Sequence, residues 1–275
     1  MKNKLSLIIF LFLTQSLLAQ ETTGRRTERD AKKQERRDKI DNLIRQQEEG
    51  ALVFNKQNVY GLRLNSDGWS VFFEKGILKS VTVTNLYGLE IGEKKNKKEN
   101  KVPGQAVSDG FFIFSTTPYR YGKQNIFYQV KPFIGQQRHV GGKTNKNGVA
   151  VQAIYGGGIS LGLERPYYIK VEDPNTSEVK DIKYSVADSA LFLNPTYILQ
   201  GTGLRHGWND MKIVPGVHAK AALRFDYGRF NELVSAIEVG LNVEAYSRKV
   251  NIMLLNPGKQ LFFNSYIAIL LGKRK

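Results

Sequence analysis

Hydrophobic and polar residues alternate with a period of two along much of the C-terminal part of the chain. In residues 231–250, NELVSAIEVGLNVEAYSRKV, the large apolar residues fall on odd numbers, and most charged or polar residues fall on even numbers. A β-strand places alternate side chains on opposite faces, so this pattern predicts a sheet whose two faces meet different surroundings. Residues 211–227 repeat the contrast, and residues from about 260 to 272 form another segment of this kind.

Weaker alternation marks five earlier segments, at about 51–65, 68–76, 78–91, 123–137 and 148–164. With residues 228–231 as a tight hairpin connection, the pattern gives about eight strands, which is an even number.

The lengths of the connections support a closed arrangement of these strands. Segments 92–122 and 165–210 are long and open at one rim, whereas the connections after the second, fourth and sixth strands are shorter. This asymmetry is typical of outer-membrane barrels. We predict an all-β fold, an antiparallel up-and-down transmembrane β-barrel of about eight strands, or of ten if segment 165–210 hides a further strand pair.

Glycines and charges indicate which face of the predicted barrel points inward. Small side chains suit the crowded interior of an eight-stranded barrel, and large aliphatic and aromatic side chains suit contact with lipid. The glycines in phase with the polar set are Gly156, Gly158, Gly162, Gly216, Gly240 and Gly272.

The polar set carries both signs of charge, and charge is tolerated inside a protein when it is paired. We therefore predict a lumen filled by an ion-pair network rather than an open pore. Its expected members are Lys212, Lys220, Arg224, Glu232, Glu238, Glu244 and Arg248.

The N-terminus has the layout of a secretory signal peptide, which we assign to residues 1–20. Lys2 and Lys4 precede an apolar run from residue 5 to residue 13, which is shorter than the roughly 20 apolar residues of a membrane-spanning helix. An uncleaved membrane anchor is the alternative. Residues 21–50 carry many charges at i, i+4 spacing, so we predict a charged helical or disordered periplasmic leader, with a docking helix as the alternative. Residues 51–275 form the predicted barrel.

The composition narrows the chemistry that the protein can perform. The chain of 275 residues has no cysteine, which excludes disulfides and thiolate metal sites, and its three histidines, His139, His206 and His218, are widely spaced. No cofactor or metal is expected. No G-x-S-x-G elbow accompanies the histidines, so we expect a non-enzymatic protein. The alternative is a lipid-modifying enzyme at a rim, with His206 beside a serine and a carboxylate.

The chain is basic, with 41 Lys plus Arg against 25 Asp plus Glu and a formal net charge of +16. Export makes nucleic acid an unlikely partner, and outer-membrane lipid is expected to be the main one. The run EKKNKKENK falls in a predicted external loop, where its lysines can pair with lipopolysaccharide phosphates or remain solvated. These residues are Lys94, Lys95, Lys97, Lys98 and Lys101.

Residues 51–275 resemble the small outer-membrane β-barrel proteins of Gram-negative bacteria. The general look is similar to Bacteroidetes-type barrels, including the small barrels associated with their secretion machinery. The resemblance depends on the signal sequence ending LLAQ, on YGLRLNSDGW with VFFEKG, and on the last three alternating strands. Many such proteins end on an aromatic residue, whereas this chain ends LLGKRK.

The resemblance implies a protein of the cell outer membrane that acts in envelope structure, binds a partner through its loops, or assists a secretion or transport complex. A soluble exported barrel that resembles a lipocalin and holds a small apolar ligand is the alternative, and it requires large apolar side chains to point inward.

Overall fold

A computed structural model of the chain describes residues 32–37, 55–80, 82–105, 107–108, 113–114, 117–141, 148–228 and 233–275. The chain divides into two compact units, Met1–Val53 and Phe54–Lys275. In the first unit, residues 32–37 of the predicted leader are helical and exposed. The predicted signal peptide and the rest of the leader lie outside the described residues.

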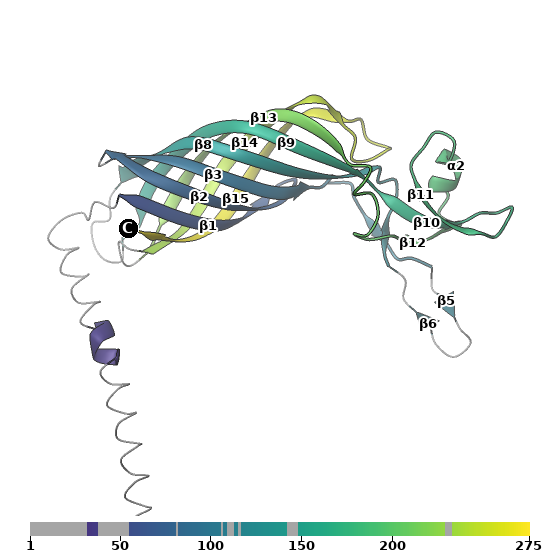
Figure 1. The fold of residues 1–275 in the computed structure, drawn as a ribbon, viewed down its shortest axis with the longest axis horizontal. Helices are drawn as coiled ribbons and strands as arrows, with labels where there is room; N and C mark the ends of the chain where they lie inside the picture. The colour runs from purple at the N-terminus through teal and green to yellow at the C-terminus, as the bar shows by residue number, and fades with distance from the viewer. Residues whose placement is uncertain are drawn as a thin grey trace, which may run out of the picture. The chain divides into compact units, whose positions relative to one another are not determined.

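Eight antiparallel strands of the second unit close into a barrel in the order β1-β15-β14-β13-β9-β8-β3-β2 (Figure 1). The first strand pairs with the last, which closes the ring. The sequence prediction of an eight-stranded antiparallel barrel is therefore confirmed. The barrel strands are β1 (Lys56–Asn65), β2 (Gly68–Ser80), β3 (Val83–Lys94), β8 (Asn125–Gly141), β9 (Ala150–Pro166), β13 (Lys212–Asp226), β14 (Leu233–Val250) and β15 (Lys259–Arg274).

The strands turn their apolar side chains outward and their polar side chains inward. On β14, Leu241 is 48% exposed, whereas its neighbours Asn242 and Gly240 face the interior. On β15, Phe263 is 67% exposed and Asn264 is buried. This is the orientation that the glycine and charge argument predicts, and it is the reverse of what the lipocalin-like alternative requires.

The interior is crowded where glycines were expected. A Cβ atom on Gly240 would lie 2.6 Å from the Cβ of Ala222 and 2.8 Å from the ring of Tyr266. On Gly162 it would lie 2.4 Å from the ring of Phe127. These distances are shorter than van der Waals contact, so larger side chains at either position would force their neighbours to move.

The two ends of the barrel differ in their connections. At one end, which we call the short-turn rim, β2, β8 and β13 end and β3, β9 and β14 begin, together with the start of β1 and the end of β15. At the other end, the long-loop rim, lie segments 66–67, 95–124, 167–211 and 251–258. The two long segments open at the same rim, as the sequence indicated.

Segment 167–211 adds no strand to the barrel but forms a small sheet of its own, in the order β11-β10-β12. Its members are β10 (Tyr168–Glu172), β11 (Val179–Lys183) and β12 (Ile198–Gly201), with the short helix α2 (Ser189–Phe192) between them. The apolar core of this loop sheet includes Ile169, Val171 and Phe192, which are buried. Apolar stretches that suggested ten barrel strands therefore serve a hydrophobic cluster at the long-loop rim, which Ile126 at the start of β8 also joins.

Segment 95–124 contains two short strand pairs, β4 (Lys101–Val102) with β7 (Tyr119–Arg120), and β5 (Val107–Ser108) with β6 (Ile113–Phe114). Among the described residues, no helix has both the length and the hydropathy that crossing a bilayer would require.

Candidate functional site

The lumen of the barrel holds a continuous chain of ion pairs in which bases and acids alternate. We call this chain the charge ladder. Its ten residues come from β1, β2, β3, β8, β13 and β14 and from the turn between β1 and β2. The five bases are Arg63, Lys94, Lys131, Lys220 and Arg224, and the five acids are Asp67, Glu74, Glu90, Glu238 and Glu244.

The ladder begins about half-way along β2 and β13. Lys220 Nζ lies 2.8 Å from a carboxylate oxygen of Glu74, and Arg224 lies 2.5 Å from the other oxygen of the same carboxylate. Arg224 also pairs with Glu238 at 2.6 Å. Glu238, on β14, also pairs with Arg63 of β1, at 3.3 Å. Each carboxylate here is shared by two cations, which offsets the cost of burying its charge.

The ladder then continues to the long-loop rim. The guanidinium of Arg63 pairs with Glu90, and Glu90 pairs with Lys131 at 2.8 Å. Lys131 lies 3.0 Å from Glu244, and Glu244 lies 3.3 Å from Lys94, the last residue of β3. Lys94 ends the series with a 2.7 Å bond to the carboxylate of Asp67 in the turn between β1 and β2.

Aromatic side chains line the ladder and hold its members in place. The guanidinium carbon of Arg63 lies 4.6 Å from the ring centroid of Phe72 and 4.1 Å from that of Tyr266. The Tyr266 hydroxyl donates to Glu238 at 2.7 Å, and the Tyr246 hydroxyl donates to Glu244 at 2.9 Å. Cation–π contacts and hydrogen bonds of this kind add stability where water is excluded.

The structure brings together four of the seven residues named from the sequence for the lumen. Lys220, Arg224, Glu238 and Glu244 belong to the ladder. Lys212 and Arg248 do not, because both lie at the long-loop rim and are exposed. Glu232 lies outside the described residues.

The sequence analysis missed the acids and bases of β1, β2, β3 and β8. Arg63 stands between Leu62 and Leu64, and Glu74 follows two phenylalanines, so each of these charges interrupts an apolar stretch. A charge in the inward phase of an otherwise apolar strand is the signal that could have found them.

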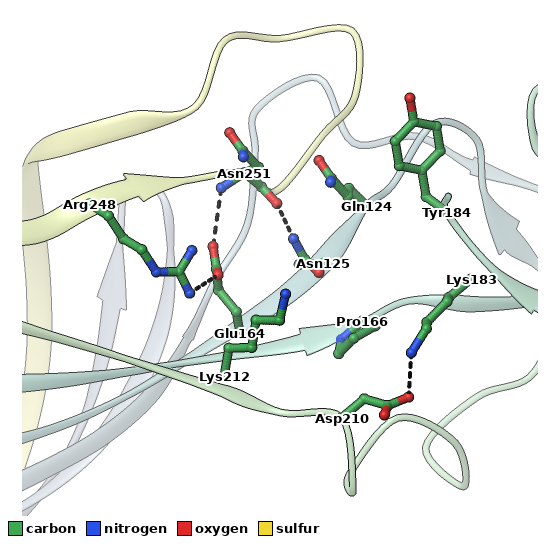
Figure 2. A pocket seen from close by; sticks show the side chains of 10 residues that line it. All are labelled: Gln124, Asn125, Glu164, Pro166, Lys183, Tyr184, Asp210, Lys212, Arg248 and Asn251. Carbon is green, nitrogen blue, oxygen red and sulfur yellow. Dashed lines mark hydrogen bonds and ion pairs between the residues drawn. The ribbon is translucent and has the colours of Figure 1, made fainter. Parts of the chain in front are cut away.

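A polar cleft of about 270 Å³ opens at the long-loop rim (Figure 2). Residues from the ends of four barrel strands line it, together with residues from the loop sheet and the segment that follows it. The lining residues are Gln124, Asn125, Glu164, Pro166, Lys183, Tyr184, Asp210, Lys212, Arg248 and Asn251.

Two ion pairs bound the cleft, and an unpaired cation lies between them. Glu164 pairs with Arg248 at 2.6 Å, and Lys183 pairs with Asp210 at 2.8 Å. In Figure 2 the side chain of Lys212 lies between these two pairs. Within the part of the chain that the structure describes, the side chain of Lys212 makes no hydrogen bond and no ion pair, although its charge helps to lower the pKa of Asp210.

Lys183 and Asp210 each stabilise the charged form of the other. A hydrogen bond from Lys183, together with one from the hydroxyl of Tyr168, holds the pKa of Asp210 below its usual value. The same bond to Asp210 raises the pKa of Lys183. The cleft therefore offers fixed charges of both signs and amide groups, which suit a small ionic or hydroxylated ligand.

The histidines are separated from one another. His218 lies in the lumen, where its Nδ1 is 3.1 Å from the hydroxyl oxygen of Ser160. His206, in the segment after the loop sheet, lies 3.3 Å from Asp181 and packs beside Tyr168. His139 is exposed near the end of β8. Within the described ranges, no serine bonds to His206, and no group of three or more histidine or carboxylate residues is placed to hold a metal ion.

The lysine run divides into two parts. Lys94 is buried in the ladder and is 1% exposed, so it is not available to an external ligand, contrary to the expectation from the sequence. The misplacement arose because Lys94 is the last inward-facing residue of β3 rather than the start of a loop. The remaining four, which we call the loop quartet, are exposed: Lys95, Lys97, Lys98 and Lys101.

Comparison with known proteins gives distant structural matches. No protein family and no curated protein matches the sequence. Among solved structures, Ail, the attachment invasion locus protein of Yersinia pestis, aligns over 81% of this chain and 100% of its own, with 6% identity and a TM-score of 0.34. Neisserial surface protein A (NspA) aligns over 80% of this chain and 96% of its own, with 8% identity and a TM-score of 0.34. Values this low carry no conclusion about function.

Proposed function

We propose that this protein is a non-enzymatic, integral outer-membrane β-barrel with a sealed lumen that acts through the loops of its long-loop rim. The proposal is supported mainly by the distribution of polarity in the barrel wall. Apolar side chains point outward and charged side chains point inward, which is the reverse of a soluble barrel. In water, a closed barrel with this wall would expose a continuous apolar band around its circumference, which soluble monomers avoid. In lipid the same wall is stable, because a closed barrel leaves no strand edge unpaired.

The proposal includes an orientation. Outer-membrane barrels have short turns in the periplasm and longer loops outside the cell. The short-turn rim, with both ends of the barrel, then faces the periplasm. The loop sheet and the polar cleft face outward, where an envelope or secretion partner can reach them.

We assign no catalytic role to the rim. His206 and Asp181 form a pair at the long-loop rim, but the serine that a hydrolase would need beside them is absent from the described residues. The loop sheet is packed on a hydrophobic core and presents charged side chains, so we propose that it binds a partner. We propose two roles for it: the loop sheet supports the structure of the envelope, or it binds a secretion or transport complex as an accessory protein.

The loop quartet is the second contact surface that we propose. Its four exposed lysines follow the last residue of β3 at the rim that faces outward, at the level where lipopolysaccharide phosphates lie. Lysine binds phosphate through charge-assisted hydrogen bonds, and a cluster binds more tightly than a single side chain.

Gel mobility tests the main proposal. The full chain is extracted from outer membranes and run in SDS without heating and after boiling. A closed barrel resists SDS until it is boiled, so we expect the unheated sample to migrate differently from the boiled one. Recovery in the soluble periplasmic fraction, with no change on boiling, would contradict the proposal.

A further inference from the structure

A second group of lysines lies on the outer wall of the barrel at the short-turn rim. We call it the wall quartet, and it comprises Lys56, Lys75, Lys273 and Lys275. Lys56 is the first residue of β1, Lys75 lies on β2, and Lys273 and Lys275 lie at the end of the chain. All four are exposed. In Figure 1 the C-terminus is marked at this end of the barrel, beside the start of β1.

The strand register brings the four lysines together. Lys75 and Lys273 are both register partners of Asn58, one from each neighbouring strand. Lys56 and Lys275 are paired through two backbone hydrogen bonds of 2.9 Å and 2.8 Å. Side chains opposite each other in adjacent strands have Cβ atoms roughly 4.5–5.5 Å apart. The quartet thus occupies two adjacent rows of one small area of the wall.

No described carboxylate neutralises the wall quartet. Glu74 and Arg274, the sequence neighbours of these lysines, point inward and are paired with Lys220 and Asp226. None of the four lysines forms an ion pair among the described residues. Lys56 and Lys275 lie directly opposite each other, and like charges in that arrangement destabilise a sheet unless an anion lies between them.

The rows toward the middle of the barrel are apolar. Tyr60 is the register partner of both Phe73 and Leu271, and the rings of Tyr60 and Phe73 lie 5.0 Å apart. In the next row Leu62 is the register partner of Val71 and of Ile269, and all three are exposed. The wall thus changes from apolar to cationic within one row.

We propose that the wall quartet binds the headgroup phosphate of an anionic glycerophospholipid, whose acyl chains lie on the apolar rows above it. The lipid belongs to the membrane leaflet at the short-turn rim. An amphiphile with one negative headgroup and two hydrocarbon chains matches the order of charges and apolar residues along the wall. The lysine stems can lie on apolar surface while their ammonium groups reach the phosphate. This proposal rests on the proposed membrane location.

Native mass spectrometry of the folded full chain tests the proposal. The detergent-purified protein is mixed with equal amounts of phosphatidylglycerol and phosphatidylcholine that have the same acyl chains, and the bound lipids are counted. The variant replaces Lys56, Lys75, Lys273 and Lys275 with glutamine. The control replaces Arg205, Lys249 and Lys259 with glutamine, because these exposed cations lie at the opposite rim and belong to neither lysine quartet. Mobility in unheated SDS shows that each variant is folded.

We expect the native chain and the control with Arg205, Lys249 and Lys259 replaced to retain phosphatidylglycerol over phosphatidylcholine. A lysine near an anionic lipid surface contributes about fivefold to binding, so the wall-quartet variant is expected to lose at least about tenfold of this preference. Equal retention of the two lipids by the native chain, or an unchanged preference in the wall-quartet variant, would overturn the inference and leave the barrel proposal intact. Loss of the heat-dependent mobility in the native chain would overturn both.

Discussion

At the scale of single residues, the ladder makes the barrel sensitive to the loss of one charge. Arg224 is 1% exposed and holds Glu74 and Glu238 together. A buried carboxylate that loses its partner keeps the full cost of desolvation, which is why breaking a buried pair destabilises more than the pair itself stabilises. The chemical identity of each ladder residue is therefore more constrained than that of the exposed apolar residues around it.

The substitution Arg224→Met tests this point. We expect the free energy of unfolding to fall by about 3–5 kcal/mol, because two carboxylates lose a shared cation. Urea titration of the folded band in unheated SDS gels measures the change. The control is Arg205→Met at an exposed loop position, which is expected to change stability by about 0.5 kcal/mol or less. Equal midpoints for the two variants would contradict a stabilising role for the ladder.

The alternation of residues shows whether a side chain points inward or outward more readily than it shows the position of that side chain along the barrel axis. Lys212 and Arg248 share the inward phase with Lys220 and Glu244, and this much followed from alternation. Both lie where their strands rise past the wall into the rim, so they meet solvent instead of the lumen. Lys94 shows the opposite case, because a residue at a strand end was assigned to a loop. Strand ends are set by hydrogen bonds between distant segments, which a single sequence does not display.

At the scale of elements, the loop sheet has a hydrophobic core whose buried residues lie mostly outside the barrel wall, with Ile126 of β8 joining it. Its buried residues pack with one another, and Phe192 forms an edge-to-face contact with Tyr184 at 5.7 Å. An element with its own core can loosen while the barrel remains closed. The eight barrel strands were predictable from period-two alternation, whereas the loop sheet was not, because its strands have only four or five residues.

The substitution Phe192→Ala should separate these two units. We expect the loop sheet to lose about 3–5 kcal/mol of local stability through the cavity that is left, with the heat-dependent gel mobility of the barrel retained. Limited proteolysis should then cleave segment 167–211 faster than in the native chain. Val186→Ala is the control, because Val186 is 86% exposed. Simultaneous loss of the folded band would show that the loop sheet and the barrel are one cooperative unit.

The loop quartet provides another prediction at this scale. Replacing Lys95, Lys97, Lys98 and Lys101 with glutamine should lower retention of the protein on immobilised lipopolysaccharide, and the difference should shrink at high salt because exposed charges are screened. The control replaces Arg205, Lys249 and Lys259 with glutamine, because these exposed cations belong to neither lysine quartet. Unchanged retention in the loop-quartet variant would mean that these lysines are only solvated.

At the scale of the whole molecule, the filled lumen predicts that the barrel does not conduct ions. An eight-stranded barrel has an interior that side chains can fill, and here the ladder occupies it from the middle of β2 and β13 to the long-loop rim. Reconstituted into a planar bilayer, the native protein should show no steady conductance above that of protein-free detergent. A stable ohmic step for each inserted molecule would contradict a sealed lumen.

The ladder also has a consequence for the order in which the molecule is assembled. Its pairs join residues far apart in the chain, with separations of 146 positions between Glu74 and Lys220 and 175 between Arg63 and Glu238. The first strands to be made therefore carry charges whose partners arrive with the last ones. In a truncated or mispaired barrel these charges would remain unpaired in an apolar environment, at a high cost in free energy. In the correctly closed barrel each charge has its partner. The ion pairs of the lumen therefore stabilise the closed eight-stranded barrel over every partly assembled one.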